Sequence, residues 1–278
     1  MDRLEAHRLF FARLVTASAG VPATEERLIA AFASTPRERF VGDGPWQVFT
    51  RMGYIQTPSD DPAFLYQDIT VALEKEKQIN NGQPTLHAVC LAALGVKEGE
   101  SVVHIGAGTG YYTALLAQLT GSAGSVAAYE IDPELAGRAM RNLADLSQVT
   151  VHPRSGTEGR LPACDALYVN AGTTAPLDVW LDALRPGGRL LFRLTPPQAP
   201  GAMLLVTRKE ADRFAARFVC GAMFIPCAGA CDDETAQKLS VAFRRGDLAG
   251  VRSLRRDASP DETCWCAGSG WWLSAADP

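Results

Sequence analysis

Three glycines and one carboxylate form a pattern in this sequence that is suited to binding a nucleoside. In "VHIGAGTGYYTALLAQL", Gly106, Gly108 and Gly110 lie between a short apolar run and a run with helical spacing. Glycine allows a positive φ and lets a ligand approach the backbone, so the stretch predicts a binding turn between a strand and a helix. Glu130 ends the next predicted strand, where its carboxylate can accept hydrogen bonds from both ribose hydroxyls.

The same stretch disfavours a dinucleotide as the ligand. The dinucleotide fingerprint places its third glycine at position 111, where this chain has the bulky Tyr111. A surface carboxylate is the alternative interpretation of Glu130. Asp132 is expected to cap the helix that Pro133 begins, rather than to bind a ligand.

A second group of polar residues lies in "INNGQPTLHA", before and within a predicted helix that Pro84 opens. Asn80, Asn81, Gln83 and Thr85 supply donors that could hold a carboxylate or an amide, although Asn and Gly are equally common in turns. A carboxylate has a reference pKa near ~3.9 and is ionised at neutral pH, so as a nucleophile it needs no general base. A phenol or amine, with a pKa near ~10, would need one.

The four histidines do not form a clear acid–base pair. If the protein transfers a group to a nucleophile, this favours a carboxylate as that nucleophile. His87 is the only histidine near the polar residues of "INNGQPTLHA", on the first turn of the helix after Pro84. His7 lies in an N-terminal helix, and His104 lies in a strand where burial is expected. His152 ends the third strand and could line an adenosine pocket.

Composition restricts the class of protein. The 278 residues carry a net charge of -4 without a basic stripe, which argues against a nucleic-acid partner. Charges in "MDRLEAHRLFFARLV" and the lack of a long apolar run argue against a signal peptide and a membrane partner, so a cytoplasmic location is expected. The seven cysteines are expected to be small buried hydrophobes. A zinc site at Cys227, Cys231, Cys264 and Cys266 is the disfavoured alternative, because the spacings do not match and no histidine is near.

The order of predicted elements indicates an α/β fold with a doubly wound, mostly parallel sheet. Helices cover the first ~40 residues, and residues 41–64 are expected to be irregular. From Gln83 onward helices and strands alternate, ending in an antiparallel hairpin. The tail is expected to form one amphipathic helix over 233–256, broken at Gly246, then a strand-turn-strand in "CWCAGSGWWLSA". Its tryptophans are expected to cap a core edge, with an aromatic wall for a ligand or a dimer contact as the alternative.

Several stretches resemble the protein-L-isoaspartate O-methyltransferase family of class I S-adenosylmethionine methyltransferases. These are "LIAAFASTPRERFVG", "LYQDI", "GQPTLHA", "IGAGTGYYTALLA", "YEIDPELAGRAMRNL" and "FAARFVCGAMFIP". The resemblance covers roughly residues 26–227 and implies a Rossmann-like fold with a seven-stranded sheet, N-terminal helices and a small C-terminal extension. It implies an acceptor-side segment over 1–82, a cofactor-binding domain over 83–227 and an extension over 228–278.

The resemblance also implies a cofactor, an acceptor and site residues. The cofactor is S-adenosylmethionine, with S-adenosylhomocysteine as product. The acceptor is an isoaspartyl or aspartyl carboxylate in a peptide or protein. The implied catalytic positions are Asn81, Gly82, Thr85 and His87. The implied cofactor-binding positions are Gln83, His104, Gly106, Ala107, Gly108, Thr109, Gly110, Tyr111, Glu130, Ile131, Gly156, Thr157, Asn170 and Ala171. No metal site is expected, and the oligomeric state is left open, with a dimer as one option.

Two departures from the family pattern leave alternatives open. Gly82 stands where the family has a Ser or Thr hydroxyl, so that role is vacant or passes to Asn80, Asn81 or Thr85. Ser155 stands where the family has the Asp that holds the adenine amine, and Glu158 is near enough to replace it. The alternatives are therefore a methyltransferase acting on a small metabolite or small acid, and a nucleoside-binding adaptor without turnover.

Overall fold

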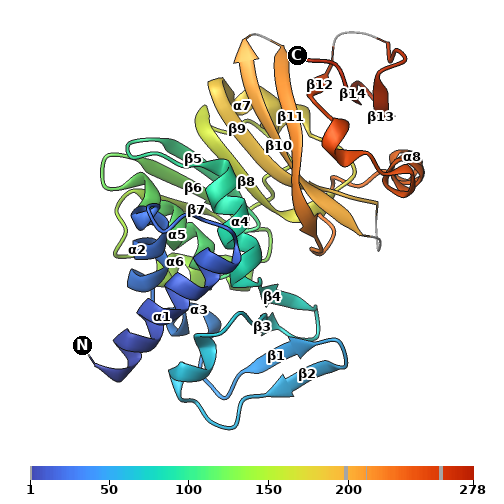
Figure 1. The fold of residues 1–278 in the computed structure, drawn as a ribbon. Helices are drawn as coiled ribbons and strands as arrows, with labels where there is room; N and C mark the ends of the chain where they lie inside the picture. Colours follow the sequence, from blue (N-terminus) through green and yellow to red (C-terminus); the bar gives the residue numbers. More distant parts are fainter. Residues whose placement is uncertain (1, 197–199, 211, 257–258) are drawn as a thin grey trace. The chain divides into compact units, whose positions relative to one another are not determined.

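The computed structural model describes residues 2–196, 200–210, 212–256 and 259–278. The chain forms two compact units, shown in Figure 1. The first unit contains Met1–Gly99 and Ala107–Arg154, and the second contains Glu100–Gly106 and Ser155–Pro278. The division by function at residues 82 and 227 stays a prediction.

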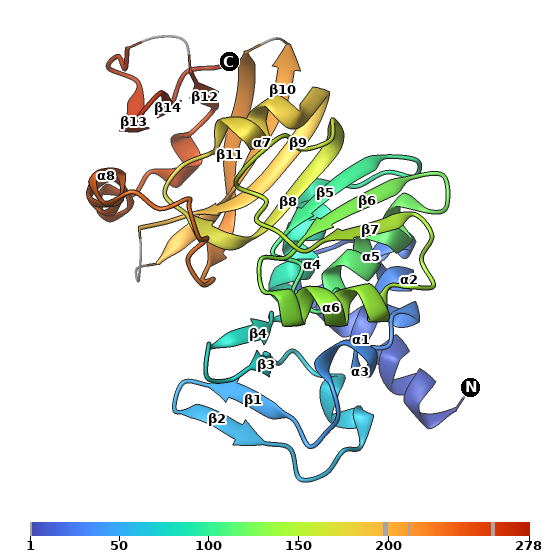
Figure 2. The ribbon, with the colours of Figure 1, turned by 180° about the vertical axis from the view of Figure 1, so that it is seen from behind.

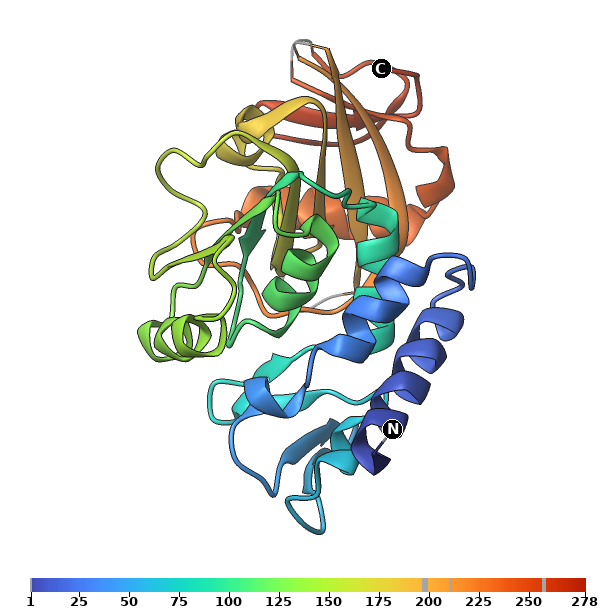
Figure 3. The same ribbon diagram turned by 90° about the vertical axis from the view of Figure 1, so that its left-hand side faces the viewer.

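Helices make up much of the first unit. They are α1 (Arg3–Ser18), α2 (Glu26–Ser34), α3 (Glu38–Val41), the 3-10 helix η1 (Pro62–Leu65), α4 (Pro84–Leu94), α5 (Tyr111–Thr120) and α6 (Pro133–Asn142). Helix α1 begins with a capping box, in which the Asp2 side chain accepts from the Glu5 amide and Glu5 reciprocates. Helices α1 and α2 lie side by side in Figure 3, with Phe11 and Phe32 in edge-to-face contact between them.

A four-stranded antiparallel sheet corrects the expectation that residues 41–64 are irregular. Its strands are β1 (Gln47–Thr50), β2 (Gly53–Gln56), β3 (Val71–Glu74) and β4 (Ile79–Asn81), in the order β2-β1-β3-β4. The pairing of Val48 with Val71 places valines from two strands together over a small core with Trp46 and Leu65. The strands are only three or four residues long, too short for a clear two-residue period in the sequence.

The first unit also holds the parallel pair β6 (Ser125–Tyr129) and β7 (Val149–His152), in register from Val126 opposite Val149. Asp132 caps α6, as expected, because its side chain accepts from the amides of Glu134 and Leu135. This cap fixes the direction in which the chain leaves β6, directly after Glu130.

The second unit is a large sheet with few helices, seen from behind in Figure 2. Its elements are β5 (Ser101–Ile105), β8 (Cys164–Thr173), α7 (Asp178–Ala183), β9 (Leu184–Leu194), β10 (Gly201–Glu210), β11 (Arg213–Ala222), α8 (Asp233–Arg245), the 3-10 helix η2 (Leu248–Gly250), β12 (Ser253–Arg255), β13 (Cys264–Gly268) and β14 (Trp271–Ser274). Strands β5, β8 and β9 are parallel, and β10 and β11 add to them antiparallel.

The α/β class is as expected, but the sheet differs from the expected seven strands. It is mixed and has ten strands, eight of them in the second unit in the order β13-β14-β12-β11-β10-β9-β8-β5. The difference comes from the tail, which pairs with β11 through Leu254 opposite Phe214. A sheet edge that would otherwise expose backbone groups is thereby continued by three short strands.

The tail follows its prediction only in part. Helix α8 ends where expected, because Gly246 has a φ of 83°. Beyond it the predicted helix is wrong, since the chain forms η2 and then β12, with Leu254 only 1% exposed. The tryptophans cap a core edge, as expected: Trp265 packs edge-to-face on Phe218 and Phe243, and Trp271 and Trp272 are buried.

Some properties concern the described residues as a whole. No helix among them is long and apolar enough to cross a membrane. In the same residues no three His, Cys, Asp or Glu side chains gather as they would around a metal ion. Cys90, Cys164, Cys227 and Cys266 are buried, whereas Cys231 is exposed.

Candidate functional site

The glycine turn has the backbone that its sequence predicts. Gly106, in the second unit, has a φ of 76°, and Gly108 and Gly110, in the first, have φ values of 57° and 98°. At Gly110 the φ of 98° favours glycine, and a Cβ would also lie 2.7 Å from Cδ1 of Leu143. The Ala107 amide donates to the Tyr129 carbonyl at 3.1 Å, which ties this turn to the end of β6.

Each carboxylate oxygen of Glu130 accepts a hydrogen bond from a different backbone segment, one from the glycine turn and one from the chain that follows Glu130. Oε2 accepts from the Gly108 amide at 2.7 Å, and Oε1 accepts from the Asp132 amide at 3.0 Å. The side chain is 7% exposed, and this burial raises the pKa of Glu130, while the two amides act in the opposite direction. A carboxylate has four lone-pair sites, so two remain for hydroxyl donors of a ligand.

The surroundings of Glu130 suit a flat ring. Ile131 is apolar yet 57% exposed. On β7, His152 stacks on Tyr129 with ring centroids 4.7 Å apart, and burial together with Arg154 lowers the pKa of His152. Lys77 forms an ion pair with Asp132 at 2.5 Å, joining the β3–β4 turn to the cap of α6.

Thr109 and Tyr111, two other predicted cofactor positions, have inward-facing side chains. The Thr109 hydroxyl donates to the Phe40 carbonyl at 2.5 Å, and Tyr111 packs edge-to-face on Phe40. Both are 1% exposed. Any contact with a ligand at these two positions would therefore come from the backbone.

In the second unit, the structure brings His104, Gly106 and Asn170 together. Burial lowers the pKa of His104 to about 3, so its ring is neutral. Asn170 Nδ2 lies 2.8 Å from His104 Nε2 and donates to it. A Cβ on Gly106 would lie 3.5 Å from Asn170 Cβ, so this glycine brings the turn close to the end of β8. Asn170 Oδ1 is buried and has no hydrogen-bond partner among the described residues, an acceptor available for a donor such as an ammonium group.

The predicted positions around Gly156 form a tight turn. A Cβ on Gly156 would lie 2.7 Å from Cγ1 of Ile105, and its carbonyl accepts from the Trp180 indole at 2.8 Å. Ser155 Oγ accepts from the Thr157 amide at 3.1 Å and lies 2.7 Å from its hydroxyl. Ala171 is buried, at 9% exposure, and Glu158 is exposed.

On the predicted acceptor side, Asp68 holds the start of α4. Its Oδ1 accepts from the Thr85 amide at 2.7 Å, and its Oδ2 accepts from Gln83 Nε2 at 2.8 Å. An acidic side chain is favoured there because helix N-termini leave amides unpaired and carry partial positive charge. The Thr85 hydroxyl is buried and has no hydrogen-bond partner among the described residues.

The two asparagines before Gly82 already have partners. Asn80 Oδ1 accepts from the Tyr54 hydroxyl at 2.8 Å, and Asn81 Oδ1 accepts from Arg37 Nε at 3.2 Å. Arg37 is 0% exposed and donates further to the carbonyls of Leu65, Gln67 and Ile69. A buried guanidinium with this many acceptors fixes the segment that carries Asp68.

Gly82 lies against the imidazole of His87. A Cβ at residue 82 would be 2.3 Å from His87 Nε2, far inside van der Waals contact. His87 is 1% exposed and stacks on Tyr112 with ring centroids 3.5 Å apart, and the Tyr112 hydroxyl donates to the Gly82 carbonyl at 2.6 Å. The space of a side chain at residue 82 is thus filled by His87.

Sequence reasoning did not assign roles to Arg37, Asp68 and Tyr112. The first two lie in "PRERF" and "LYQDI", stretches that carry the family resemblance, so a sequence pattern for them was present. The contact of Tyr112 with Gly82 spans thirty positions in the chain and has no such pattern.

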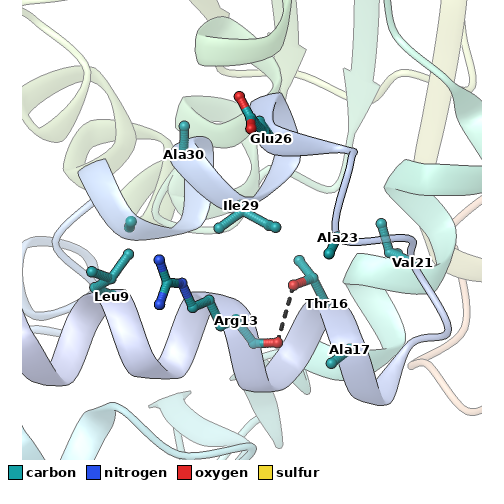
Figure 4. A pocket seen from close by; sticks show the side chains of 10 residues that line it. Leu9, Arg13, Thr16, Ala17, Val21, Ala23, Glu26, Ile29 and Ala30 are labelled. Atoms are coloured by element: carbon teal, nitrogen blue, oxygen red, sulfur yellow. Dashed lines mark hydrogen bonds between the residues drawn. The ribbon is translucent and has the colours of Figure 1, made fainter.

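A groove between α1 and α2 lies apart from these residues in the sequence and shares none of them. Its volume is about 570 Å³, and Leu9, Ile29 and several alanines line it together with Arg13 and Glu26 (Figure 4). Nothing in the described structure indicates an occupant.

Comparison with known sequences identifies relatives of the whole central part of the chain. The family model described as protein-L-isoaspartate(D-aspartate) O-methyltransferase matches residues 16–232. A protein-L-isoaspartate O-methyltransferase of Brucella anthropi is 28% identical over 209 residues, which cover 74% of this chain and 87% of that protein. One from Methanoculleus marisnigri is 30% identical over 209 residues, which cover 74% and 84%.

Solved structures agree on the fold. A protein-L-isoaspartate O-methyltransferase matches 85% of this chain and 69% of its own with a TM-score of 0.67 at 21% identity. A Plasmodium falciparum structure described as such an enzyme, in complex with S-adenosyl-L-homocysteine, matches 79% and 97% with a TM-score of 0.63 at 15% identity. With the family match over most of its length, this chain belongs to the protein-L-isoaspartate(D-aspartate) O-methyltransferase family.

Proposed function

We propose that this protein is an S-adenosylmethionine-dependent carboxyl O-methyltransferase that methylates an isoaspartyl or aspartyl carboxylate in a peptide or protein. The observation that carries the proposal is Glu130, whose carboxylate is buried, bonded to the Gly108 amide and left with two lone-pair sites. Family membership supports it independently.

The residues present fit this cofactor. Glu130 would accept from the ribose hydroxyls, and exposed Ile131 would pack on the adenine. The unpartnered Asn170 Oδ1, beside Gly106, would accept from the ammonium of the methionine part. Ser155 lacks the carboxylate that the family pattern offers to the adenine amine, but neither Gly82 nor Ser155 removes the contacts proposed here for the ribose and the methionine part.

When bound, S-adenosylmethionine supplies an electrophilic methyl group: a carboxylate oxygen forms the new O–CH₃ bond while the CH₃–S bond breaks and its electron pair stays on sulfur, which leaves a methyl ester and a neutral thioether. No proton moves, because the acceptor is already ionised. The chain's task is to hold the acceptor in line, and such positioning contributes up to ~7–11 kcal/mol in favourable cases.

On the acceptor side, we assign the hydroxyl role to Thr85. Of the three candidates, Asn80 already bonds Tyr54 and Asn81 already bonds Arg37, whereas the Thr85 hydroxyl has no partner among the described residues. His87 is buried and stacked, so its assigned role is to fill the space beside Gly82 rather than to act as a base.

Two measurements test the proposed function. Calorimetry with S-adenosylhomocysteine should show binding that Glu130→Ala weakens about thirtyfold, since a hydrogen bond to a charged group contributes ~1.5–3 kcal/mol. Incubation with labelled cofactor and an isoaspartyl peptide should give a base-labile methyl ester. Binding without turnover on any acid would favour the adaptor, and turnover on small acids alone would favour the metabolite enzyme.

Turnover on generic isoaspartyl peptides should be slow. Thr85 offers its hydroxyl from a different position than residue 82, where the family pattern places it, and loss of a well-placed hydrogen bond of this kind costs ~0.5–1.5 kcal/mol, or up to about tenfold in rate. We therefore expect a more specialised carboxyl acceptor to react faster.

A further inference from the structure

The four-stranded sheet of the first unit packs one face on a small core, and its other face carries a partly exposed aromatic pair. Val48 and Val71 point to the core on one face, so Phe49 and its register partner Tyr54 point to the other. Their rings meet edge-to-face at 5.4 Å, and Phe49 is 49% exposed. We call Phe49, Tyr54, Lys75 and Asn80 the open sheet face.

This face is continuous with the segment proposed to hold the acceptor. The Tyr54 hydroxyl donates to Asn80 Oδ1, which joins the aromatic pair to β4 at the sheet's other edge. Strand β4 ends at Asn81, immediately before Gly82. If the carboxylate of a peptide lies beside Thr85, the residues that flank it must contact the neighbouring surface. The open sheet face is such a surface, because it includes Asn80, which lies five residues before Thr85.

Two positively charged side chains on or beside this face, Lys75 and Arg51, could pair with acidic residues of a peptide. Lys75 Nζ lies 5.9 Å from the centre of the Tyr54 ring, and Arg51 is exposed in the β1–β2 turn. Neither cation forms a salt bridge with another of the described residues. In contrast, Lys77 is paired with Asp132, and the only other charge exposed in the β3–β4 turn is Glu76.

The same hairpin adds apolar surface. Met52, in the β1–β2 turn, is 97% exposed. Aromatic and methionine side chains give large contact areas, and such residues are enriched in protein interfaces. Exposed apolar side chains that gather rather than scatter indicate a binding surface.

We propose that the open sheet face, with Arg51 and Met52, docks the residues that flank the methylated carboxylate, and that the acceptor is an acidic peptide with an aromatic or large aliphatic side chain near that carboxylate. The assignment of this surface to the acceptor rests on the proposed function. Aromatic contact supplies affinity, and the two cations select for acidic neighbours and speed the encounter.

Methyl transfer to a matched pair of short isoaspartyl peptides tests this inference. One carries a tyrosine and acidic residues beside the acceptor, and the other carries glycine and serine there. We expect the first to have a roughly tenfold higher kcat/KM, as for loss of one interface anchor. Phe49→Ala and Lys75→Glu should each raise KM for the first peptide with little change in kcat, and should leave the second peptide unaffected.

The matched control variants are Phe10→Ala and Arg13→Glu, which change a phenylalanine more exposed than Phe49 and an exposed arginine, both on α1. They should leave KM unchanged for both peptides. Calorimetry with S-adenosylhomocysteine should give the same affinity in all four variants, which shows that they are folded. Equal kcat/KM for the two peptides, or an equal KM in Phe49→Ala and in Phe10→Ala, overturns the inference and leaves the proposed function standing.

Peptide binding separates this inference from the proposed function. A fluorescein-labelled form of the first peptide, with an amide in place of the acceptor carboxylate, should bind in an anisotropy titration that weakens with salt and in Lys75→Glu. Such binding without methyl transfer to any peptide would support the docking surface and reject the methyltransferase. Binding that Phe49→Ala and Lys75→Glu leave unchanged would reject the surface.

Discussion

At the scale of single residues, Glu130 has two tasks that depend on its charge. It connects the glycine turn to the start of α6 through two amides, and we propose that it also receives the ribose hydroxyls. Both tasks use lone pairs of the ionised carboxylate, yet burial favours the neutral form and raises the pKa of Glu130. The backbone amides that donate to Glu130 therefore oppose the effect of burial on its pKa.

This conflict predicts a pH dependence of cofactor binding. S-adenosylhomocysteine affinity should fall as pH drops through the raised pKa of Glu130, because the protonated group loses an acceptor, and Glu130→Gln should show a flatter profile.

The effect on folding has the opposite sign: the native state holds this proton more tightly than the unfolded chain, so this group's contribution to stability is present at low pH and lost as pH rises through that pKa. Calorimetry and thermal melts over the same pH range check both, and identical profiles in the two proteins would contradict them.

Thr85 should matter to the acceptor and not to the cofactor. Thr85→Val keeps the shape of the side chain and removes the hydroxyl, so kcat/KM for the acceptor peptide should fall up to about tenfold. Thr85→Ser is the matched control because it retains the hydroxyl, and it should stay near the wild-type value. A Thr85→Val enzyme as fast as Thr85→Ser would show that the hydroxyl is not used.

Restoring a hydroxyl at residue 82 should fail unless His87 is also changed. Gly82→Ser alone forces its Cβ onto His87 Nε2, and overpacking of a buried site costs about 1–3 kcal/mol. The variant should melt earlier and should not gain activity. Gly82→Ser with His87→Ala should recover part of the lost stability and raise kcat/KM on isoaspartyl peptides, and the double-mutant cycle measures the coupling. If Gly82→Ser alone is stable and faster, our placement of this loop is wrong.

At the scale of elements, α4 depends on a cap supplied from a distant part of the chain. Gln83 precedes the helix and makes no side-chain cap, so Asp68 provides the acceptor instead. Arg37, by donating to three carbonyls between Leu65 and Ile69, holds Asp68 in place. The start of α4 and the loop after η1 are therefore held together.

Asp68→Asn should loosen the start of α4. We expect a loss of about 1 kcal/mol from the weaker cap and dipole contact, and a fall in Tm of ~2–4 °C. Asp43→Asn is a suitable control, because Asp43 is exposed and lies outside the helix start. Since Thr85 is the residue that Asp68 holds, kcat/KM for the acceptor should also fall, whereas the S-adenosylhomocysteine affinity should not. An equal loss of affinity in Asp68→Asn would contradict this separation.

The elements also show what a sequence can reveal. The glycine turn, α4 and the Asp132 cap were predictable because each depends on residues adjacent in the chain, such as Pro84 at a helix start or Gly110 before one. The sheet β1–β4 was not, because its stability comes from Val48, Val71 and Trp46, which meet across about 25 positions of sequence that include a long loop. The choice of Thr85 among the polar candidates needed their hydrogen bonds, which no pattern encodes.

At the scale of the whole molecule, the tail continues the large sheet instead of covering it. Leu254 opposite Phe214 is the contact through which β12 joins β11, and both are almost completely buried. The tail is thus expected to be a structural requirement of this chain, with Trp265 sealing its outer edge against Phe218.

Leu254→Ala should therefore destabilise the protein strongly. Truncation of a buried leucine costs about 2–5 kcal/mol, whereas Val241→Ala, at a position on α8 that is 57% exposed, should stay within about 0.5 kcal/mol. Urea unfolding followed by tryptophan fluorescence compares them, because three of the five tryptophans lie in the tail. Equal midpoints for the two variants would show that the tail is only loosely attached.

The contact between Gly82 and His87 has a consequence for how this branch of the family could have arisen. With the His87 ring where it lies here, a hydroxyl-bearing residue at 82 does not fit, because its Cβ would lie 2.3 Å from Nε2. We therefore expect the two positions to change as a pair or through an intermediate with glycine and a small residue. Across related sequences, serine or threonine at the first position should co-occur with a residue smaller than histidine at the second, and histidine there should co-occur with glycine. Such covariation would identify the members of the family that lack the hydroxyl at position 82, and it would indicate that the hydroxyl was lost when histidine appeared at position 87.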